Sequence, residues 1–268
     1  MNAQPIPVFV GPSLPPAFRP EDSAFSWHPP ASAGDLLAWL DRPPPMLCLI
    51  DGFFDSRPAP WHKELLMLMA RGTRVLGAAS MGALRAAELD GLGMIGVGAI
   101  YRAYRDGRLT GDDEVALIHA TERLGWAPLT VPMVEVRATL VAACRAGLIG
   151  VDVARRIRAC VHDIHFESRD WPLMEARCLG EGLVDAATFR RLRELHVPLK
   201  RIDALACLAV ARRSHAPHRA IPPPYTCFIQ ELAELVGQER DAQAPLRRPR
   251  KTVRPPRRAA DDGGRSSS

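Results

Sequence analysis

Residues 73–89 read TRVLGAASMGALRAAEL, and this stretch decides the fold. An apolar run over residues 73–78 leads almost directly into Ser80, after which Ala, Leu and Glu favour a helix over residues 83–89. A buried strand that passes into a helix through small residues is typical of βα units, whose strands lie parallel in one sheet. The stretch therefore predicts an α/β fold.

Two further apolar runs precede this stretch. Residues 6–10 and 46–50 are both short, and each ends in turn-forming residues. Residues 34–40 and 59–70, which lie between the runs, have the apolar spacing of helices. We therefore expect a small parallel β-sheet flanked by helices, in an α/β core that spans residues 5–125.

The second half of the chain has helical patterns separated by glycines. The predicted helices cover residues 97–105, 112–122, 131–146, 151–164, 186–195 and 202–212, with a short one over 227–236 after a run of prolines. They predict a helical C-terminal region, residues 126–236, that packs on the core as an extension. Residues 237–268 have no periodicity and are rich in Arg and Pro, so we expect a disordered basic tail.

Composition narrows the function classes. The chain has 268 residues, of which 47% are hydrophobic and 24% charged, which excludes collagen-like, wholly disordered and disulfide-scaffold proteins. The net charge of +5 comes from residues 238–268, where nine Lys and Arg accompany four Asp and Glu. The body is therefore neutral, and neither specific nucleic-acid binding nor a membrane span is expected. Because no C-x-x-C pair and no secretory-signal pattern occurs, we expect a reduced, cytoplasmic protein.

A polar residue follows each of the three predicted strands, namely Ser13, Asp51 and Ser80. The carboxyl ends of parallel strands meet at one edge of a sheet, where ligands bind, so we expect these side chains to face one crevice. Ser80 lies in an A-x-S-x-G sequence, which approximates the G-x-S-x-G nucleophile elbow. The amides of Met81 and Gly82 would then face a bound anion. The alternative is that Ser80 only caps the helix that follows it.

A nucleophilic serine needs a base, and two histidines are candidates. His62 begins the helix that follows the strand at 46–50, so we expect it on the carboxyl side of the sheet. His119 lies in the predicted helix 112–122, two turns after its first residue. For both histidines the alternative is an ordinary place on a surface or in a core.

The remaining motifs lack the context that their chemistry needs. Residues 91–96 match G-x-G-x-x-G but follow a helix, whereas a dinucleotide site follows a strand, and no P-loop sequence occurs. The acidic cluster 112–114 is explained by the dipole of a helix N-terminus. His162 and His165 have no third ligand for zinc. We therefore expect neither a metal site nor a cofactor.

Several blocks in order resemble the TfuA-like family. They are VFVGPSL (8–14), DGFF (51–54), WHKEL (61–65), GAASMGALRAAEL (77–89), GMIGVG (93–98) and DDEVA (112–116), and the resemblance covers about residues 8–143. It implies an accessory role beside YcaO-type enzymes, which use ATP to activate a peptide-bond oxygen. That oxygen is replaced by sulfur, giving a thioamide in a ribosomally made peptide or protein. The resemblance also implies that sulfide is released or delivered from a thiocarboxylated sulfur-carrier protein.

Hydrolysis of a thiocarboxylate is acyl transfer, so the implied role gives the candidate residues specific tasks. Ser80 would be the nucleophile, and His62 or His119 would be the base. Asp51 or Glu64 would orient that base. No Cys falls between residues 51 and 119, which disfavours sulfur carriage as a persulfide on this chain.

The same role requires a group that binds the carboxyl end of the carrier. Lys63 and Arg85 are the candidates, because both carry a positive charge within the blocks of resemblance. Two other interpretations stay open. One is a non-catalytic adapter that binds the YcaO-type protein and its peptide substrate, and the other is a stand-alone esterase of the α/β class.

Overall fold

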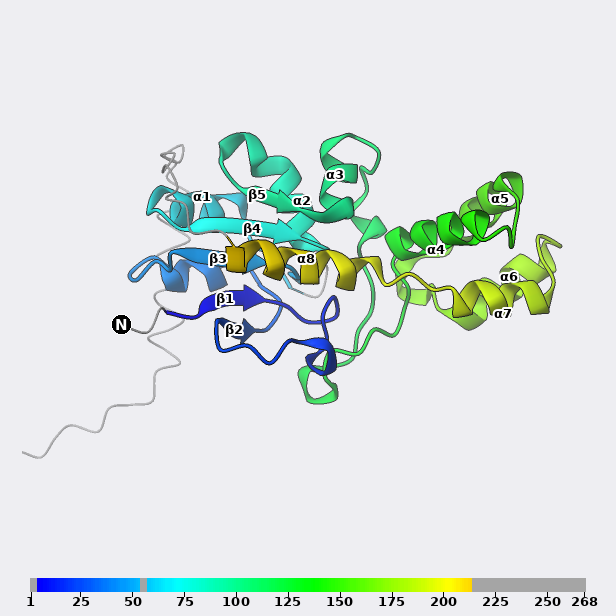
Figure 1. The fold of residues 1–268 in the computed structure, drawn as a ribbon, viewed down its shortest axis with the longest axis horizontal. Coiled ribbons are helices and arrows are strands. Elements are labelled where there is room, and N and C mark those ends of the chain that lie inside the picture. The colour runs from blue at the N-terminus through cyan, green and yellow to red at the C-terminus, as the bar shows by residue number, and fades with distance from the viewer. Residues whose placement is uncertain (1–3, 54–56, 214–268) are drawn as a thin grey trace, which may run out of the picture.

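The computed structural model describes residues 4–53 and 57–213. Its centre is a five-stranded sheet in the order β2-β1-β3-β4-β5, and all neighbouring strands are parallel (Figure 1). The strands are β1 (Ile6–Phe9), β2 (Phe25–His28), β3 (Met46–Leu49), β4 (Arg74–Ala78) and β5 (Ile95–Val97). The predicted class, a small parallel sheet flanked by helices, is confirmed. This order puts a topological switch point between β1 and β3, which is where open parallel sheets bind ligands.

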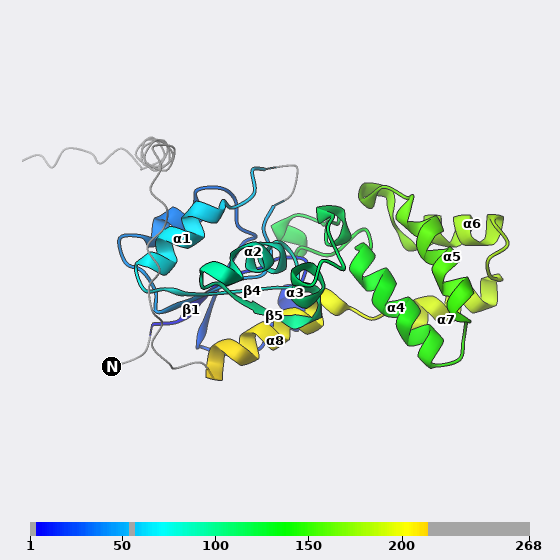
Figure 2. The ribbon, with the colours of Figure 1, turned by 90° about the horizontal axis from the view of Figure 1, so that it is seen from above.

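Helices cover both faces of the sheet (Figure 2). On one face lie α1 (His62–Ala70), α2 (Met81–Leu89) and α3 (Gly98–Arg105), which share an apolar core with Leu47 and Leu49 of β3. On the other face lies α8 (Leu199–Arg213), which packs against Cys48 of the same strand and against Ile50 just after it. Because successive side chains of a strand point to opposite faces, a continuous apolar run is needed to fill both.

Four further helices form a second body with its own apolar core. They are α4 (Met133–Arg145), α5 (Val151–His162), α6 (Trp171–Gly180) and α7 (Ala186–Glu194). Their core is built around residues such as Met133, Ile157 and Phe189. Figure 1 shows this body beyond the carboxyl ends of the strands, and the chain then returns along the sheet as α8. The helical body is thus an insertion between α3 and α8, and α8, although inside residues 126–236, packs on the sheet.

The predicted helix over residues 112–122 is wrong. Only two 3-10 turns form there, η4 (Asp112–Glu114) and the start of η5 (Glu122–Leu124), and between them His119 bridges to Pro128. The Ile118 N–H donates to the Thr130 hydroxyl at 2.8 Å. The Ile118 carbonyl accepts a hydrogen bond from the Leu129 N–H, also at 2.8 Å. Contacts with residues 128–130 therefore replace the helical hydrogen bonds that the apolar spacing suggested.

Several other elements differ from the sequence expectation. Within residues 34–40 only Asp35–Trp39 is helical, as a 3-10 helix, and β2, β5 and α6 match none of the predicted elements. β2 is an edge strand with mixed polarity, and β5 is only three residues long. The short helices of the 3-10 type are η1 (Pro16–Phe18), η2 (Asp35–Trp39), η3 (Asp90–Leu92), η4, η5 (Glu122–Leu124) and η6 (Phe166–Ser168).

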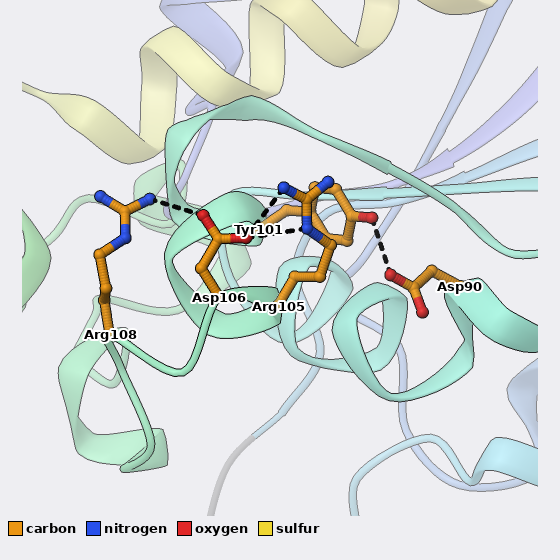
Figure 3. A network of polar contacts seen from close by, with 5 residues as sticks. All are labelled: Asp90, Tyr101, Arg105, Asp106 and Arg108. Atoms are coloured by element: carbon orange, nitrogen blue, oxygen red, sulfur yellow. Dashed lines mark hydrogen bonds and ion pairs between the residues drawn. The ribbon is translucent and has the colours of Figure 1, made fainter.

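An exposed polar network joins α3 to η3 (Figure 3). The hydroxyl of Tyr101 donates to Asp90 at 2.9 Å, and the guanidinium of Arg105 lies 5.5 Å from the centre of the Tyr101 ring. Arg105 and Arg108 both donate to the carboxylate of Asp106. Only the contact between Tyr101 and Asp90 joins α3 to η3, and the whole network lies outside the cavity described below.

The glycines of the G-x-G-x-x-G match have packing roles. Gly93 has φ 106°, a left-handed conformation that ends η3 and that glycine adopts without strain. A Cβ atom on Gly96 would lie 2.1 Å from the Tyr101 ring, so only glycine lets α3 cover β5 this closely. The motif follows α2, whereas a dinucleotide site follows a strand.

The predicted helix 227–236 and the predicted tail 237–268 lie outside the described residues. Among the helices that the structure does describe, none combines the length and the apolar character needed to cross a bilayer.

Candidate active site

The side chain of Asp51 joins the ends of β1 and β3. One carboxylate oxygen, Oδ2, accepts the N–H groups of Gly11 and Ser13 at 2.8 and 2.9 Å. The other, Oδ1, accepts the Ser13 hydroxyl at 2.6 Å. Asp51 and Ser13 thus meet at the carboxyl edge of the sheet. The Ser13 hydroxyl donates to Asp51, which makes this serine a support for the carboxylate.

The turn between β4 and α2 is tight and strained. Ala79 has φ 66°, and the Ser80 N–H donates back to the carbonyl of Ala78 at 2.8 Å. A Cβ atom on Gly82 would lie 1.8 Å from the carbonyl oxygen of Leu49, so glycine is required for the first turn of α2 to rest on the end of β3. This packing fixes where the Ser80 side chain stands.

Ser80 occupies the N-cap position of α2, yet its hydroxyl makes no capping hydrogen bond. The hydroxyl is therefore not used as the cap that the alternative interpretation required. Of the two amides expected to face an anion, the Gly82 N–H donates to the carbonyl of Ile50 at 3.1 Å. The Met81 N–H has no hydrogen-bond partner among residues 4–53 and 57–213. Only Met81 thus keeps an amide of the kind that stabilises an oxyanion.

A cavity of about 290 Å³ opens beside these strand ends. Its wall combines the ends of β3 and β4, the loop after η4, η6 from the helical body and the first turn of α8. Its polar lining residues are Asp51, Ser80, His119, Glu167 and Lys200. Chain segments as far apart as 51 and 200 therefore meet at one site.

Neighbouring groups fix the orientation of the His119 ring. Its Nδ1 lies 2.9 Å from the carbonyl oxygen of Ala120, which accepts hydrogen bonds only, so Nδ1 carries a proton. In the neutral ring Nε2 is then the acceptor. The ring also packs edge-on against Trp126, with 5.2 Å between centres, and near Phe53 at 6.3 Å.

Lys200 is a cavity residue that the sequence interpretation missed. It lies in the first turn of α8, is 2% exposed, and donates from Nζ to the carbonyl of Val115 at 2.8 Å. Burial lowers the pKa of its amine, although the carboxylates of Asp51 and Glu135 oppose this. Such an amine gives up its proton more readily than an exposed lysine does, and while it is protonated it attracts an anion. The one sequence signal was rarity, since only three of the chain's 35 basic residues are Lys.

Two predicted site residues lie together outside the cavity. The Nε2 atom of His62 is 2.7 Å from a carboxylate oxygen of Glu88, and Arg85 donates to the same oxygen at 2.8 Å. Burial acts to raise the pKa of Glu88, but these two hydrogen bonds outweigh it and lower that pKa. Arg85 also donates to the carbonyl of Pro60. His62 and Arg85 thus join the start of α1 to α2 and do not line the cavity.

Glu64 and Lys63 also lie on α1, away from the cavity lining. The carboxylate of Glu64 is fully buried and accepts the N–H groups of Gly34, Leu36 and Trp61 at 2.9, 3.3 and 3.1 Å. The partners of this carboxylate are thus backbone N–H groups and not a histidine. The carboxylate instead secures η2 and the start of α1.

The acidic residues near 112–114 make structural pairs. Glu114 receives two hydrogen bonds from Arg137, and Asp113 lies 3.8 Å from the buried Arg169. His165 lies 3.6 Å from a carboxylate oxygen of Glu167. In the part of the chain that the structure describes, no group of three or more His, Cys, Asp or Glu is placed to hold a metal ion.

Residues 51–170 match the family model described as TfuA-like protein, which confirms the resemblance seen in the sequence blocks. No curated protein matches the chain. The matched range includes Asp51, Ser80 and His119, whereas Ser13 and Lys200 lie outside it.

Proposed function

Because residues 51–170 match the TfuA-like family model, we propose that this chain assists a YcaO-type ATP-dependent enzyme in forming a backbone thioamide on a ribosomally made peptide or protein. Its own reaction in this proposal is the release of sulfide from a thiocarboxylated sulfur carrier. One observation carries the proposal: Ser80 stands at the N-cap of α2 with a hydroxyl that makes no cap, in a cavity shared with His119 and Lys200.

The proposed reaction is an acyl transfer in two steps. Ser80 Oγ attacks the thiocarboxylate carbon and gives up its proton, the C–S bond breaks, and sulfur leaves with the bonding electrons as hydrosulfide. Water then attacks the resulting ester, which restores the Ser80 hydroxyl and frees the carrier with an ordinary carboxylate. The sum converts thiocarboxylate and water into carboxylate and hydrogen sulfide. The steps need no oxidant or reductant.

His119 is the proposed base in both steps. The Ala120 carbonyl fixes its Nδ1–H, so the lone pair of Nε2 is available to accept the Ser80 proton. This orienting group is a backbone carbonyl, where the sequence interpretation proposed Asp51 or Glu64. In our proposal Asp51 instead provides negative charge near Lys200, and Glu64 has no catalytic task.

Lys200 is the proposed group for the carrier's negatively charged end, in place of Lys63 or Arg85, because only Lys200 lines the cavity. An ammonium held in a buried site attracts a thiocarboxylate more strongly than an exposed one does. The Met81 amide, which has no hydrogen-bond partner within the described part of the chain, is the proposed donor to the oxyanion. A volume of about 290 Å³ suits the extended end of a carrier chain and not a folded domain.

Sulfide release from a purified thiocarboxylated carrier tests this function. We expect Ser80→Ala to lower the initial rate about 100-fold or more, and His119→Gln to lower it at least about tenfold. Ser26→Ala and His162→Gln are matched controls, because these side chains lie away from the cavity lining. Sulfide is quantified after derivatisation, and circular dichroism checks the fold of each variant. Release by Ser80→Ala at the control rate would refute the catalytic role.

A non-catalytic adapter is the second candidate function. It is favoured by the absence of any hydrogen bond from the Ser80 hydroxyl to His119 or Lys200 within the described residues. The two functions differ when the thiocarboxylated carrier is the only sulfur source in a reaction with the YcaO-type enzyme and its peptide. If the protein is an adapter, its Ser80→Ala variant still supports the exchange of oxygen for sulfur in the peptide. If the protein is the proposed hydrolase, the same variant does not.

A further inference from the structure

The helical body has an apolar groove between α4 and α5 on its outer surface. The groove has a volume of about 440 Å³, and its floor includes Leu140, Val141, Val151 and Ala154. Val141 and Val151 are 49% and 66% exposed. Exposed apolar side chains that are grouped in a concave surface often mark a binding site, whereas single scattered ones are common on any protein surface.

Arginines surround this floor. Arg137, Arg145, Arg155 and Arg158 all line the groove. Arg137 is held by Glu114, and Arg155 makes only a solvent-exposed pair with Asp152. Arg145 and Arg158 have no ion pair with any residue in the ranges 4–53 and 57–213. The rim therefore presents at least two guanidinium groups to a partner, each shaped to bind a carboxylate in two-point fashion.

We propose that this arginine-rimmed groove binds an acidic amphipathic peptide segment of a partner protein. The aliphatic side chains of the segment would cover Val141 and Val151, and its carboxylates would pair with Arg145 and Arg158. The argument rests on charge complementarity with the arginine rim and on the exposed apolar floor of the groove. It goes beyond the proposed function, because the groove shares no lining residue with the Ser80 cavity.

Two other occupants fit the groove less well. The chain's own residues 238–268 carry nine Lys and Arg against four Asp and Glu, so arginines would repel them. Single-stranded nucleic acid binds through aromatic stacking as well as charge, and the groove's lining residues include no aromatic side chain. An acidic segment with aliphatic side chains matches both the rim and the floor.

Fluorescence anisotropy with a designed probe tests this surface. The probe is a fluorescein-labelled helix of about 14 residues, roughly four turns, with Leu on one face and Glu on the other. We expect saturable binding that weakens with added salt. Replacing Leu by Ser or Glu by Lys in the probe should each reduce affinity about tenfold or more.

Variants of the protein locate the binding. Arg145→Glu with Arg158→Glu should weaken probe binding about tenfold or more, whereas Arg190→Glu with Arg193→Glu on α7 changes the net charge equally and should not. Cys144 lines the groove and is partly exposed, so bound probe should slow its alkylation, measured on its own proteolytic peptide. The proposal is overturned if both double variants lose affinity equally, if Cys144 is not protected, or if an oligonucleotide binds the groove and the Leu/Glu probe does not. These readouts are independent of sulfide release.

Discussion

Replacing Gly82 with Ala would place a methyl group where the first turn of α2 rests on the end of β3. The new Cβ atom would lie 1.8 Å from the carbonyl oxygen of Leu49 and 2.6 Å from its carbonyl carbon. Both are backbone atoms at the centre of the sheet, so neither can rotate aside as a side chain would. Helix α2 must then shift by more than about an ångström, carrying Ser80 with it.

We expect this substitution to lower the free energy of unfolding by about 3 kcal/mol or more, at the upper end of the cost of overpacking a core. For a domain of this size, that loss corresponds to a fall in melting temperature of about 6–12 °C. Urea denaturation followed by tryptophan fluorescence measures the change. Gly91→Ala is the matched control, because its Cβ would meet nothing within 4 Å, and we expect a change within about 0.5 kcal/mol.

The activity of the same variant separates positioning from stability. At a temperature where Gly82→Ala is still folded, sulfide release should fall at least about tenfold, because Ser80 and Met81 move with the helix. A Gly82→Ala protein that unfolds like Gly91→Ala would refute the close contact between α2 and β3, and with it our account of how Ser80 is placed.

Two further predictions concern buried carboxylates. Asp203 accepts the Ala99 and Ile100 N–H groups at 2.9 and 2.8 Å, and so joins α8 to the start of α3. We expect Asp203→Ala to lower the free energy of unfolding in urea by about 2–4 kcal/mol. A loss under about 0.5 kcal/mol would contradict this coupling between the two helices. Burial raises the pKa of Glu64 above its usual 4.5, so its contribution to stability is present below that value and is lost as pH rises through the folded-state pKa. The stability of the wild type relative to Glu64→Gln should therefore fall between pH 4.5 and pH 7, and a constant difference would show that Glu64 titrates normally.

The core of the fold could be predicted because its strands are buried on both faces. Residues 46–50 and 75–78 must fill two apolar layers, so they appear as continuous apolar runs. The edge strands β2 and β5 lack that signal, because one side of each is unpaired and their burial is partial. Sequence patterns therefore gave the centre of the sheet better than its edges.

The candidate site was predictable only where it follows strand order. Asp51 and Ser80 were expected together because parallel strands end at one edge, and both line the cavity. His119 lines it for another reason, since its predicted helix does not form and a loop that bridges to Pro128 carries it there. Lys200 reaches the cavity only because α8 returns from the helical body, a long-range path that no local pattern encodes.

The central claim is that Ser80 is acylated during sulfide release, and intact-mass spectrometry of an acid-quenched reaction with thiocarboxylated carrier tests it most directly. We predict an ester between the carrier's carboxyl end and the protein, located on the proteolytic peptide that contains Ser80 and absent from Ser80→Ala. His119→Gln should form the ester more slowly than the wild type, because His119 is the proposed base for acylation as well as for hydrolysis. Sulfide release without any such adduct, at the same rate in Ser80→Ala as in the wild type, would contradict the claim.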